Sequence, residues 1–314
     1  MNEFGVTTLA TGDIRFINMA IFLARSLRRT NPKLTLAVVT DSSDLRLSSY
    51  FDIVVPFNES VPAGFIHKLY LYDYSPFDET LFIDSDSLVL RPLDSYINKI
   101  KVSHVSVQGF KFTDRIWAGV HPKNIKDKTG ADYMIMFNGG IYYFKKSNIA
   151  SKVFQTAKEL LLRYDDLGYY KERNRLADEP IMSTAMSMHG MNAFDDECSG
   201  MRTLIDISSA LKIDILKGEC EFLEFNGTQR RKVNPAIIHF SGAHANWFHY
   251  KRETAKLTFS ERLKWLPDSL ISEVINALYN PPYTLFTICY RTIKFILGRE
   301  RFKIFPLMPT LRYK

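Results

Sequence analysis

The chain has 314 residues, of which 46% are hydrophobic and 24% are charged, as in an ordinary soluble protein that can bury a substantial core. Its length suits one large α/β domain or two modest ones. The net charge is +7, but the segment Pro282–Lys314 has seven basic residues and one acid and contributes +6 of it. A nucleic-acid-binding domain carries a basic face across its body, so this distribution argues against nucleic acid as a partner.

The cysteines and the N-terminus predict a cytoplasmic protein. Cys198, Cys220 and Cys289 have neither metal-ligand spacing nor the even number of a disulfide framework. Met1-Asn2-Glu3 leads directly into a strand pattern, without the charged and apolar regions of a signal peptide.

The first third of the chain alternates strand and helix. Phe4–Ala10 predicts a strand, and apolar residues at helical spacing from Ile14 to Leu27 predict a helix that Asn31-Pro32 ends. Further elements are expected as strands at Leu34–Val39, Ile53–Val55 and Leu81–Ile83 and as a helix at Lys68–Tyr74. This alternation predicts an α/β fold with a mostly parallel sheet flanked by helices.

The middle of the chain is less regular. Strands are expected at His104–Val107, Tyr133–Phe137, Ile141–Phe144 and Ala236–Phe240, and helices at Val153–Leu161 and after Asp178. Gly109–Thr129 reads as a long loop, a feature that is usually functional or mobile. The chain has neither a GxGxxG nor a GxxxxGK[ST] loop, so dinucleotide and P-loop functions lack their main support.

Asp84-Ser85-Asp86 ends the apolar run that begins at Tyr70. A strand that delivers two carboxylates to its C-terminal end places them where open α/β sheets bind ligands. Asp and Ser also form turns, which is the alternative for the tripeptide alone. The short apolar run directly before it, Thr80–Ile83, has no Gly, Pro or Asn, which favours a divalent cation that carries a phosphate.

Three more motifs have structural alternatives. Asn138-Gly139-Gly140 interrupts two apolar runs and allows close backbone approach to a ligand, although a plain hairpin turn has the same pattern. Asp178-Glu179-Pro180 offers two acids, although Asp is also a common N-cap. His239 ends a predicted strand, where a histidine is more often a satisfied core residue than a ligand.

Taken together, the motifs resemble nucleotide-sugar glycosyltransferases of the GT-A type, especially glycosyltransferase family eight. The resemblance runs from Phe4 to Gly242 and rests on these segments: Thr8–Asp13, Ala24–Leu27 with Asn31-Pro32, Phe77–Asp86, Phe137–Gly140 and Asp178-Glu179. It implies a GT-A (Rossmann-like) fold over residues 1–260, with nucleotide-sugar binding in 1–100 and the acceptor side in 101–260. Residues 261–314 are then a C-terminal helical tail.

The resemblance implies a ligand for each motif. Asp84, Asp86 and His239 would bind Mn²⁺ or Mg²⁺, with Asp86 the main ligand and Asp84 shared with the nucleotide. The residues expected to bind the UDP-sugar donor are Thr8, Ala10, Asp13, Lys68, Asp84, Ser85 and Gly242. Lys68 would steady the ribose or phosphate, unless it is an ordinary surface lysine.

The catalytic residues implied by the resemblance are Asn138, Asp178 and Glu179. Asn138 and Asp178 would contact sugar hydroxyls, and Glu179 would stabilise the transition state or act as nucleophile or base. Close retaining relatives often have glutamine at the position of Glu179, so retention is expected but this residue departs from the pattern. The family also places a lysine soon after the glycine at 242, where only His244 or Lys251 could substitute.

The resulting prediction is a metal-dependent hexosyltransferase that acts on a glycan or lipid-linked acceptor in polysaccharide or glycolipid biosynthesis. A nucleotidyltransferase that makes a nucleotide-sugar is one alternative, although Thr11-Gly12-Asp13 is a poor phosphate loop. A non-catalytic nucleotide- or carbohydrate-binding module is the other.

Residues 282–314 combine basic charge with apolar bulk. The segment is too short and too charged to span a bilayer, which takes about 20 apolar residues. It can lie as an amphipathic helix on an anionic membrane, which would make the protein peripheral on the inner face of the membrane. A helix packed on the catalytic domain is the alternative.

Overall fold

The computed structural model describes residues 2–58, 60, 64–172, 174–196, 200–204, 207, 211–225 and 230–280. Residue contacts divide the chain into two compact units. Unit 1 comprises Met1–Ser87 and Pro92–Met201, and unit 2 comprises Leu88–Arg91 and Arg202–Lys314. The predicted boundary near residue 260 stays a prediction, and the segment 282–314 lies outside the described residues.

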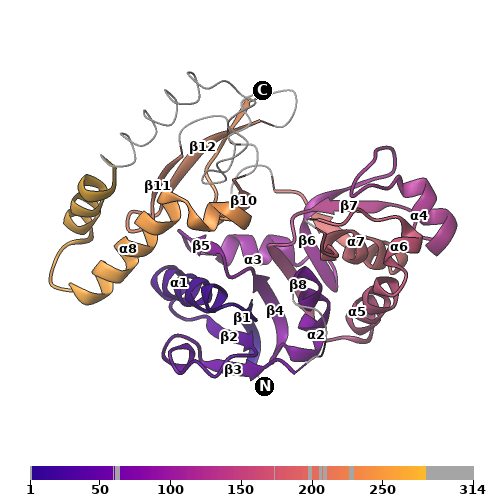
Figure 1. Ribbon diagram of the computed structural model, residues 1–314, viewed down its shortest axis with the longest axis horizontal. Coiled ribbons are helices and arrows are strands. Elements are labelled where there is room, and N and C mark those ends of the chain that lie inside the picture. The colour runs from indigo at the N-terminus through magenta and orange to yellow at the C-terminus, as the bar shows by residue number, and fades with distance from the viewer. Residues whose placement is uncertain are drawn as a thin grey trace. The chain divides into compact units, whose positions relative to one another are not determined.

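Unit 1 is built on an eight-stranded sheet with the order β3-β2-β1-β4-β8-β6-β7, and β9 pairs with β6 (Figure 1). Its strands are β1 (Asn2–Ala10), β2 (Thr35–Thr40), β3 (Ile53–Pro56), β4 (Phe77–Ile83), β6 (Val105–Phe112), β7 (Met134–Phe137), β8 (Ile141–Lys145) and β9 (Asn192–Phe194). The pairs β1–β2, β1–β4, β2–β3 and β6–β9 are parallel, and the pairs made by β8 and β7 are antiparallel. The predicted mixed, mostly parallel α/β sheet is therefore confirmed.

Three of the helices described in unit 1 begin with a side-chain N-cap. Asp13 accepts a hydrogen bond from the backbone N–H of Arg15 and caps α1, which ends before Asn31 as predicted. The helical segments are α1 (Ile14–Thr30), η1 (Leu47–Ser49), η2 (Phe65–Tyr70), α2 (Leu71–Tyr74), α3 (Asp94–Ile100), α4 (Pro122–Thr129), α5 (Asn148–Leu161), α6 (Tyr164–Leu167) and α7 (Asp178–Met188).

Alternate residues of each strand point to opposite faces of the sheet. Phe82, Tyr142 and Phe144 belong to a large buried cluster with residues of α5 and α7, whereas Leu81 and Ile83 are buried outside that cluster. Because successive strand residues point to opposite faces, the sheet is covered on both sides. The helix α1 packs beside β1, and α5 and α7 pack together (Figure 1).

Two sequence-based interpretations are wrong in this unit. The expected loop Gly109–Thr129 contains the end of β6 and the helix α4, whose single buried aliphatic side chain, Ile125, gives little helical periodicity. Asn138–Gly140 is not a plain hairpin turn, because β7 and β8 on either side of it each pair with β6.

Unit 2 holds two small sheets. One has the order β10-β14-β5 and the other β11-β12-β13. The elements are β5 (Ser87–Val89), β10 (Met201–Thr203), β11 (Lys212–Asp214), β12 (Glu219–Phe225), β13 (Arg230–Val233), β14 (Ile237–His239), η3 (Gly242–Asn246) and α8 (Phe248–Arg262), and residues 268–280 are also helical.

Buried charged side chains connect α8 to β11 and the residue that follows it. Glu253 on α8 accepts a hydrogen bond from the backbone N–H of Ile215 at 2.8 Å. Lys256 is fully buried, with its Nζ 3.1 Å from Asp214 and 3.1 Å from Glu253. These charges are paired inside the unit, which identifies them as a structural network.

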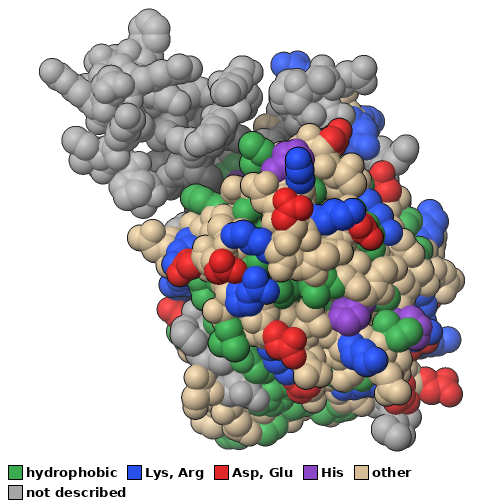
Figure 2. Space-filling model, turned by 90° about the vertical axis from the view of Figure 1, so that its right-hand side faces the viewer, with side chains coloured by type: hydrophobic (Ala, Val, Ile, Leu, Met, Phe, Trp, Pro, Cys, Tyr) green, Lys and Arg blue, Asp and Glu red, His purple; other side chains and the backbone are tan. Residues whose placement is uncertain are grey.

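The charge distribution on the surface and the length of the helices are relevant to nucleic-acid and membrane partners. On the face drawn in Figure 2, basic and acidic side chains are interspersed rather than gathered by sign. None of the helices in the described ranges is both long and apolar enough to cross a membrane.

Candidate active site

The residues after β4 form a tight turn that exposes a carboxylate. The backbone N–H of Asp84 donates to the carbonyl of Gly140 at 2.9 Å, and the N–H of Ser87 donates to the carbonyl of Asp84 at 3.0 Å. Ser85 is buried, whereas Asp84 and Asp86 are partly exposed. The turn is thus tied to the glycine motif 138–140 through the backbone.

Lys68 is a buried residue and not a surface lysine. Its side chain is 8% exposed, and its Nζ donates to Oδ2 of Asp84 at 2.8 Å and to the carbonyl of Gly139 at 2.8 Å. One ammonium group therefore joins the carboxylate after β4 to the glycine turn. Lys68 lies on the short helix η2, next to His67 in a segment whose other residues are apolar or aromatic.

The glycine turn is held from its other side by α7. The N–H of Gly139 donates to Oε1 of Glu179 at 2.7 Å, and the N–H of Gly140 donates to Oδ1 of Asn138 at 3.0 Å. A side chain at Gly139 would place its Cβ 2.8 Å from Oδ2 of Asp178. Glycine is required here because both acids approach the backbone closely.

Asp178 does not cap α7, contrary to the structural alternative. It is the first residue of the helix, after Ala177, and it is 2% exposed. Its Oδ2 accepts a hydrogen bond from the hydroxyl of Tyr142 at 2.5 Å. Tyr142 had no predicted role, although a tyrosine in a fully buried strand usually needs a partner for its hydroxyl.

In the cluster formed by Lys68, Asp84, Tyr142, Asp178 and Glu179, four groups have shifted pKa values: Lys68, Tyr142, Asp178 and Glu179. Burial lowers the pKa of Lys68, but the charges of Asp178 and Asp84 outweigh it and keep the ammonium protonated. Burial raises the pKa of Asp178, and burial followed by the charge of Asp178 raises the pKa of Glu179 to about 7. Burial and Asp178 also raise the pKa of Tyr142.

The shifted pKa of Glu179 predicts a pH-dependent difference in stability between the wild type and Glu179→Gln. Between pH 4.5 and about 7 the unfolded chain loses this proton while the folded chain keeps it, so the contribution of Glu179 to stability falls as pH rises. Glutamine keeps the acceptor for the Gly139 N–H but does not titrate. The variant should therefore gain stability relative to the wild type, by about 1–3 kcal/mol, from pH 4.5 to 8.

Urea unfolding of both proteins across this range measures the difference. Gln155→Glu, an exposed position on α5, serves as a control for a single Gln/Glu exchange. A stability difference between wild type and Glu179→Gln that stays constant with pH would contradict the assignment.

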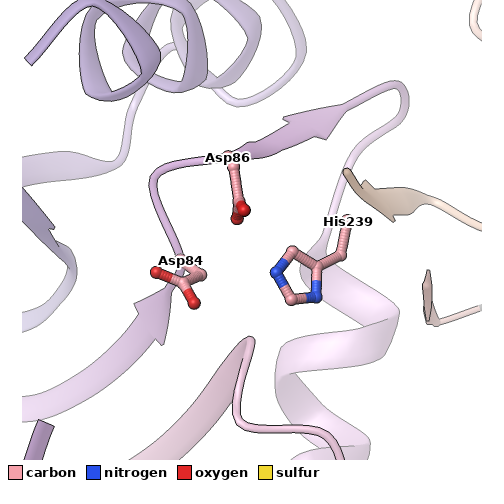
Figure 3. Close-up of side chains that lie close together, drawn as sticks. All are labelled: Asp84, Asp86 and His239. Carbon is pink, nitrogen blue, oxygen red and sulfur yellow. The ribbon is translucent and has the colours of Figure 1, made fainter. Parts of the chain in front are cut away.

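His239 ends β14, and Figure 3 draws its ring together with the carboxylates of Asp84 and Asp86. One potential ligand atom from each of Asp84, Asp86 and His239 lies within 4.8 Å of the others. The Nδ1 of His239 lies 3.2 Å from the hydroxyl of Thr203. Asp84, Asp86 and His239 are the three residues predicted as metal ligands, and their role as ligands stays a prediction.

The residues expected to bind the donor are spread over several elements of the fold. Thr8 and Ala10 are buried in β1, and the hydroxyl of Thr8 has no hydrogen-bond partner within the described part of the chain. Asp13 is exposed and caps α1, and Gly242 begins η3 with a φ of 62°.

A small hollow lies at the carboxyl ends of β2 and β3. Its volume is about 240 Å³, and Thr40, Asp41, Phe57 and Asn58 are among the residues that line it. Both carboxylate oxygens of Asp41 accept from the N–H of Gly12 at 3.0 Å, so the hollow is linked to the turn after β1. No motif in the sequence predicts this hollow, because its lining residues come from two separate strand ends.

No family model matches the chain, and no curated protein matches it. Among solved structures, a galactosyltransferase LgtC in complex with donor and acceptor sugar analogues is similar, with 18% identity over 63% of this chain and 75% of that chain and a TM-score of 0.46. Mouse xyloside xylosyltransferase 1 has 12% identity over 64% of this chain and 88% of that chain, with a TM-score of 0.42. The glycosyltransferase GlyE of Streptococcus pneumoniae has 16% identity over 62% of this chain and 46% of that chain, with a TM-score of 0.41. These proteins are glycosyltransferases, the class that the motifs resemble, and the assignment to family eight stays a prediction.

Proposed function

We propose that this protein is a metal-dependent glycosyltransferase that moves a hexose from a UDP-sugar to a glycan or a lipid-linked acceptor. The observation that carries the proposal is the gathering of Asp84, Asp86 and His239, with ligand atoms within 4.8 Å of one another. Lys68, Asp178 and Glu179 extend this charged group through Asp84 and Gly139. Carboxyl groups with raised pKa values, as in Asp178 and Glu179, are typical of catalytic sites.

The donor set fits a hard divalent cation. Two carboxylates suit Mg²⁺ or Mn²⁺, and one imidazole favours Mn²⁺. When Nδ1 of His239 donates to Thr203, Nε2 carries the lone pair that can bind the ion.

The bound cation would neutralise the diphosphate of the donor as the bond between sugar and phosphate breaks. Lys68 would act beside it by holding Asp84 in place and by placing a buried positive charge near the departing phosphate. Ser85 and Gly242, with the turn before Asp13, would supply backbone groups to the nucleotide. Thr8 and Ala10 at the end of β1 and the hollow beside β2 and β3 support a nucleoside site there.

Asn138 and Asp178 would bind hydroxyl groups of the transferred sugar. The buried Asp178 is oriented by Tyr142, so its carboxylate is fixed before the donor arrives. Glu179, with a pKa raised to about 7, can exchange a proton near neutral pH. We propose retention of configuration, with Glu179 stabilising the positive charge of the sugar in the transition state.

The test of the donor class is thermal unfolding in the presence of Mn²⁺ and a panel of UDP- and GDP-sugars. A UDP-sugar should raise the melting temperature, because a ligand that binds only the folded state stabilises it by mass action. Stabilisation by a nucleoside triphosphate together with a sugar phosphate, and by no nucleotide-sugar, would instead favour a nucleotidyltransferase. Absence of any shift with every nucleotide-sugar would contradict the proposal.

We also propose that residues 282–314 bind an anionic membrane surface and bring the enzyme to a lipid-linked acceptor at the inner face of the membrane. The support is the charge of the segment, seven basic residues against one acid, among large apolar side chains. Deletion of 282–314 should abolish co-sedimentation with anionic liposomes and leave donor binding intact. Equal co-sedimentation of the shortened protein would rule this out.

A further inference from the structure

A two-residue turn stands out in the connection between β6 and α4. Trp117 and Val120 exchange both backbone hydrogen bonds at 3.0 Å, and the central residues Ala118 and Gly119 have φ values of 50° and 83°. This combination is that of a type I′ turn, which L-residues other than Asn and Asp rarely form. Ala118 therefore holds an unfavourable conformation, which the surroundings must stabilise.

The surroundings are the segment after α6. The N–H of Tyr170 donates to the carbonyl of Ala118 at 2.8 Å, and a side chain at Gly119 would meet the backbone of Tyr170 at 3.2 Å. The turn and Tyr170 thus lie against each other. Ile116 is 72% exposed and Tyr170 is 63% exposed, while Trp117 is half-buried.

The turn is connected to the candidate active site by aromatic contacts. The ring of Trp117 lies 6.3 Å from that of Phe137, and the ring of Phe137 lies 5.5 Å from that of Tyr142. Tyr142 in turn donates to Asp178, and Phe137 directly precedes Asn138. Trp117 is therefore connected through Phe137 to Tyr142, whose hydroxyl orients Asp178.

We propose that Ile116, Trp117 and Tyr170 form a surface that binds a sugar ring of the acceptor, an inference that rests on the proposed function. Sugar rings present an apolar face of C–H groups, which packs on aromatic and aliphatic side chains, and a rim of hydroxyls. The exposed charged residues Asp114 and Arg115, next to Ile116, can bind that rim. Three side chains are too few for a protein partner, which usually covers about 20–30 residues.

The test uses two readouts from each protein with one chosen UDP-hexose. The first is the release of UDP without an acceptor, which reports donor binding and the catalytic cluster. The second is the increase in UDP release caused by methyl and p-nitrophenyl hexopyranosides, which gives a KM for the glycoside. The variants are Tyr170→Ala and Ile116→Ser, and the control is Leu162→Ser, which replaces a leucine that is 88% exposed after α5.

Tyr170→Ala and Ile116→Ser should raise the KM for the glycoside by about threefold to tenfold, as for the loss of an aromatic or apolar contact. Their UDP release without acceptor should equal that of the wild type, and Leu162→Ser should change neither value. An unchanged KM in both variants would overturn the inference, as would the absence of stimulation by every glycoside. So would equal competition by n-octanol and octyl glucoside, because the surface would then bind an alkyl chain. Failure of the wild type to release UDP from any UDP-hexose would instead reject the proposed function.

Discussion

Replacement of Asp86 by alanine is expected to lower metal-dependent UDP release by at least about a hundredfold, the scale on which enzymes lose a principal electrostatic stabiliser. Asp86 lies between the turn after β4 and the strand β5, and its carboxylate faces Asp84 and His239. Alanine removes the ligand expected to bind the cation most directly. The two remaining groups then hold the cation more weakly, so activity should recover in part at high Mn²⁺ concentration.

The fold should be unaffected by this change, because Asp86 is partly exposed and its removal relieves repulsion with Asp84. Circular dichroism and thermal unfolding check that point. Asp127→Ala on α4 is the matched control, since it removes an exposed aspartate outside the candidate site. Full metal-dependent activity in Asp86→Ala would show that the ligand assignment is wrong.

Replacement of Lys68 by methionine is expected to destabilise the protein by about 3–5 kcal/mol, because it leaves buried carboxylates without their cation. The ammonium pairs with Asp84 and lies close enough to Asp178 and Glu179 for their charges to raise its pKa. Without it, these acids take up protons more readily. The deficit in stability should therefore grow as pH rises, because the unfolded chain ionises the acids freely at high pH.

The double variant Lys68→Met/Asp84→Asn distinguishes the loss of the ion pair from the loss of side-chain packing. If the loss arises from unpaired buried charge, removal of Asp84 as well should restore part of the stability. Lys123→Met on α4 is the matched control for an exposed lysine and should change the free energy of unfolding by less than about 0.5 kcal/mol. A Lys68→Met variant as stable as the Lys123→Met control would refute the structural role of the buried pair.

The parts of the fold predicted from sequence are those with strong local patterns. The strands β1 to β4 and the helix α1 follow from apolar runs, helical spacing and the stop at Asn31-Pro32. The gathering of Asp84, Asp86 and His239 was also predicted, but it required the family resemblance, because 153 residues separate Asp86 from His239. Spacing alone cannot bring together residues from distant strands.

The features that sequence reasoning missed depend on tertiary contacts. For Lys68 the sequence left two alternatives open, a contact to the donor and an ordinary surface lysine, and only the structure places its Nζ between Asp84 and Gly139. Asp178 matched the pattern of an N-cap but points to Tyr142 instead. The short strands β10, β11 and β13 have three or four residues, too few for a period-2 pattern to be distinguished from a loop, and the seven-residue strand β12 was missed as well.

We propose above all that Asp84, Asp86 and His239 bind a divalent cation that activates a UDP-sugar. The most direct measurement is UDP release from a UDP-hexose by the wild-type protein, with Mn²⁺ and then with an excess of chelator. We expect slow release with Mn²⁺, loss of release with the chelator and recovery when Mn²⁺ is restored. Release at the same rate in the presence of the chelator, or no release from any UDP-hexose with Mn²⁺, would contradict this proposal.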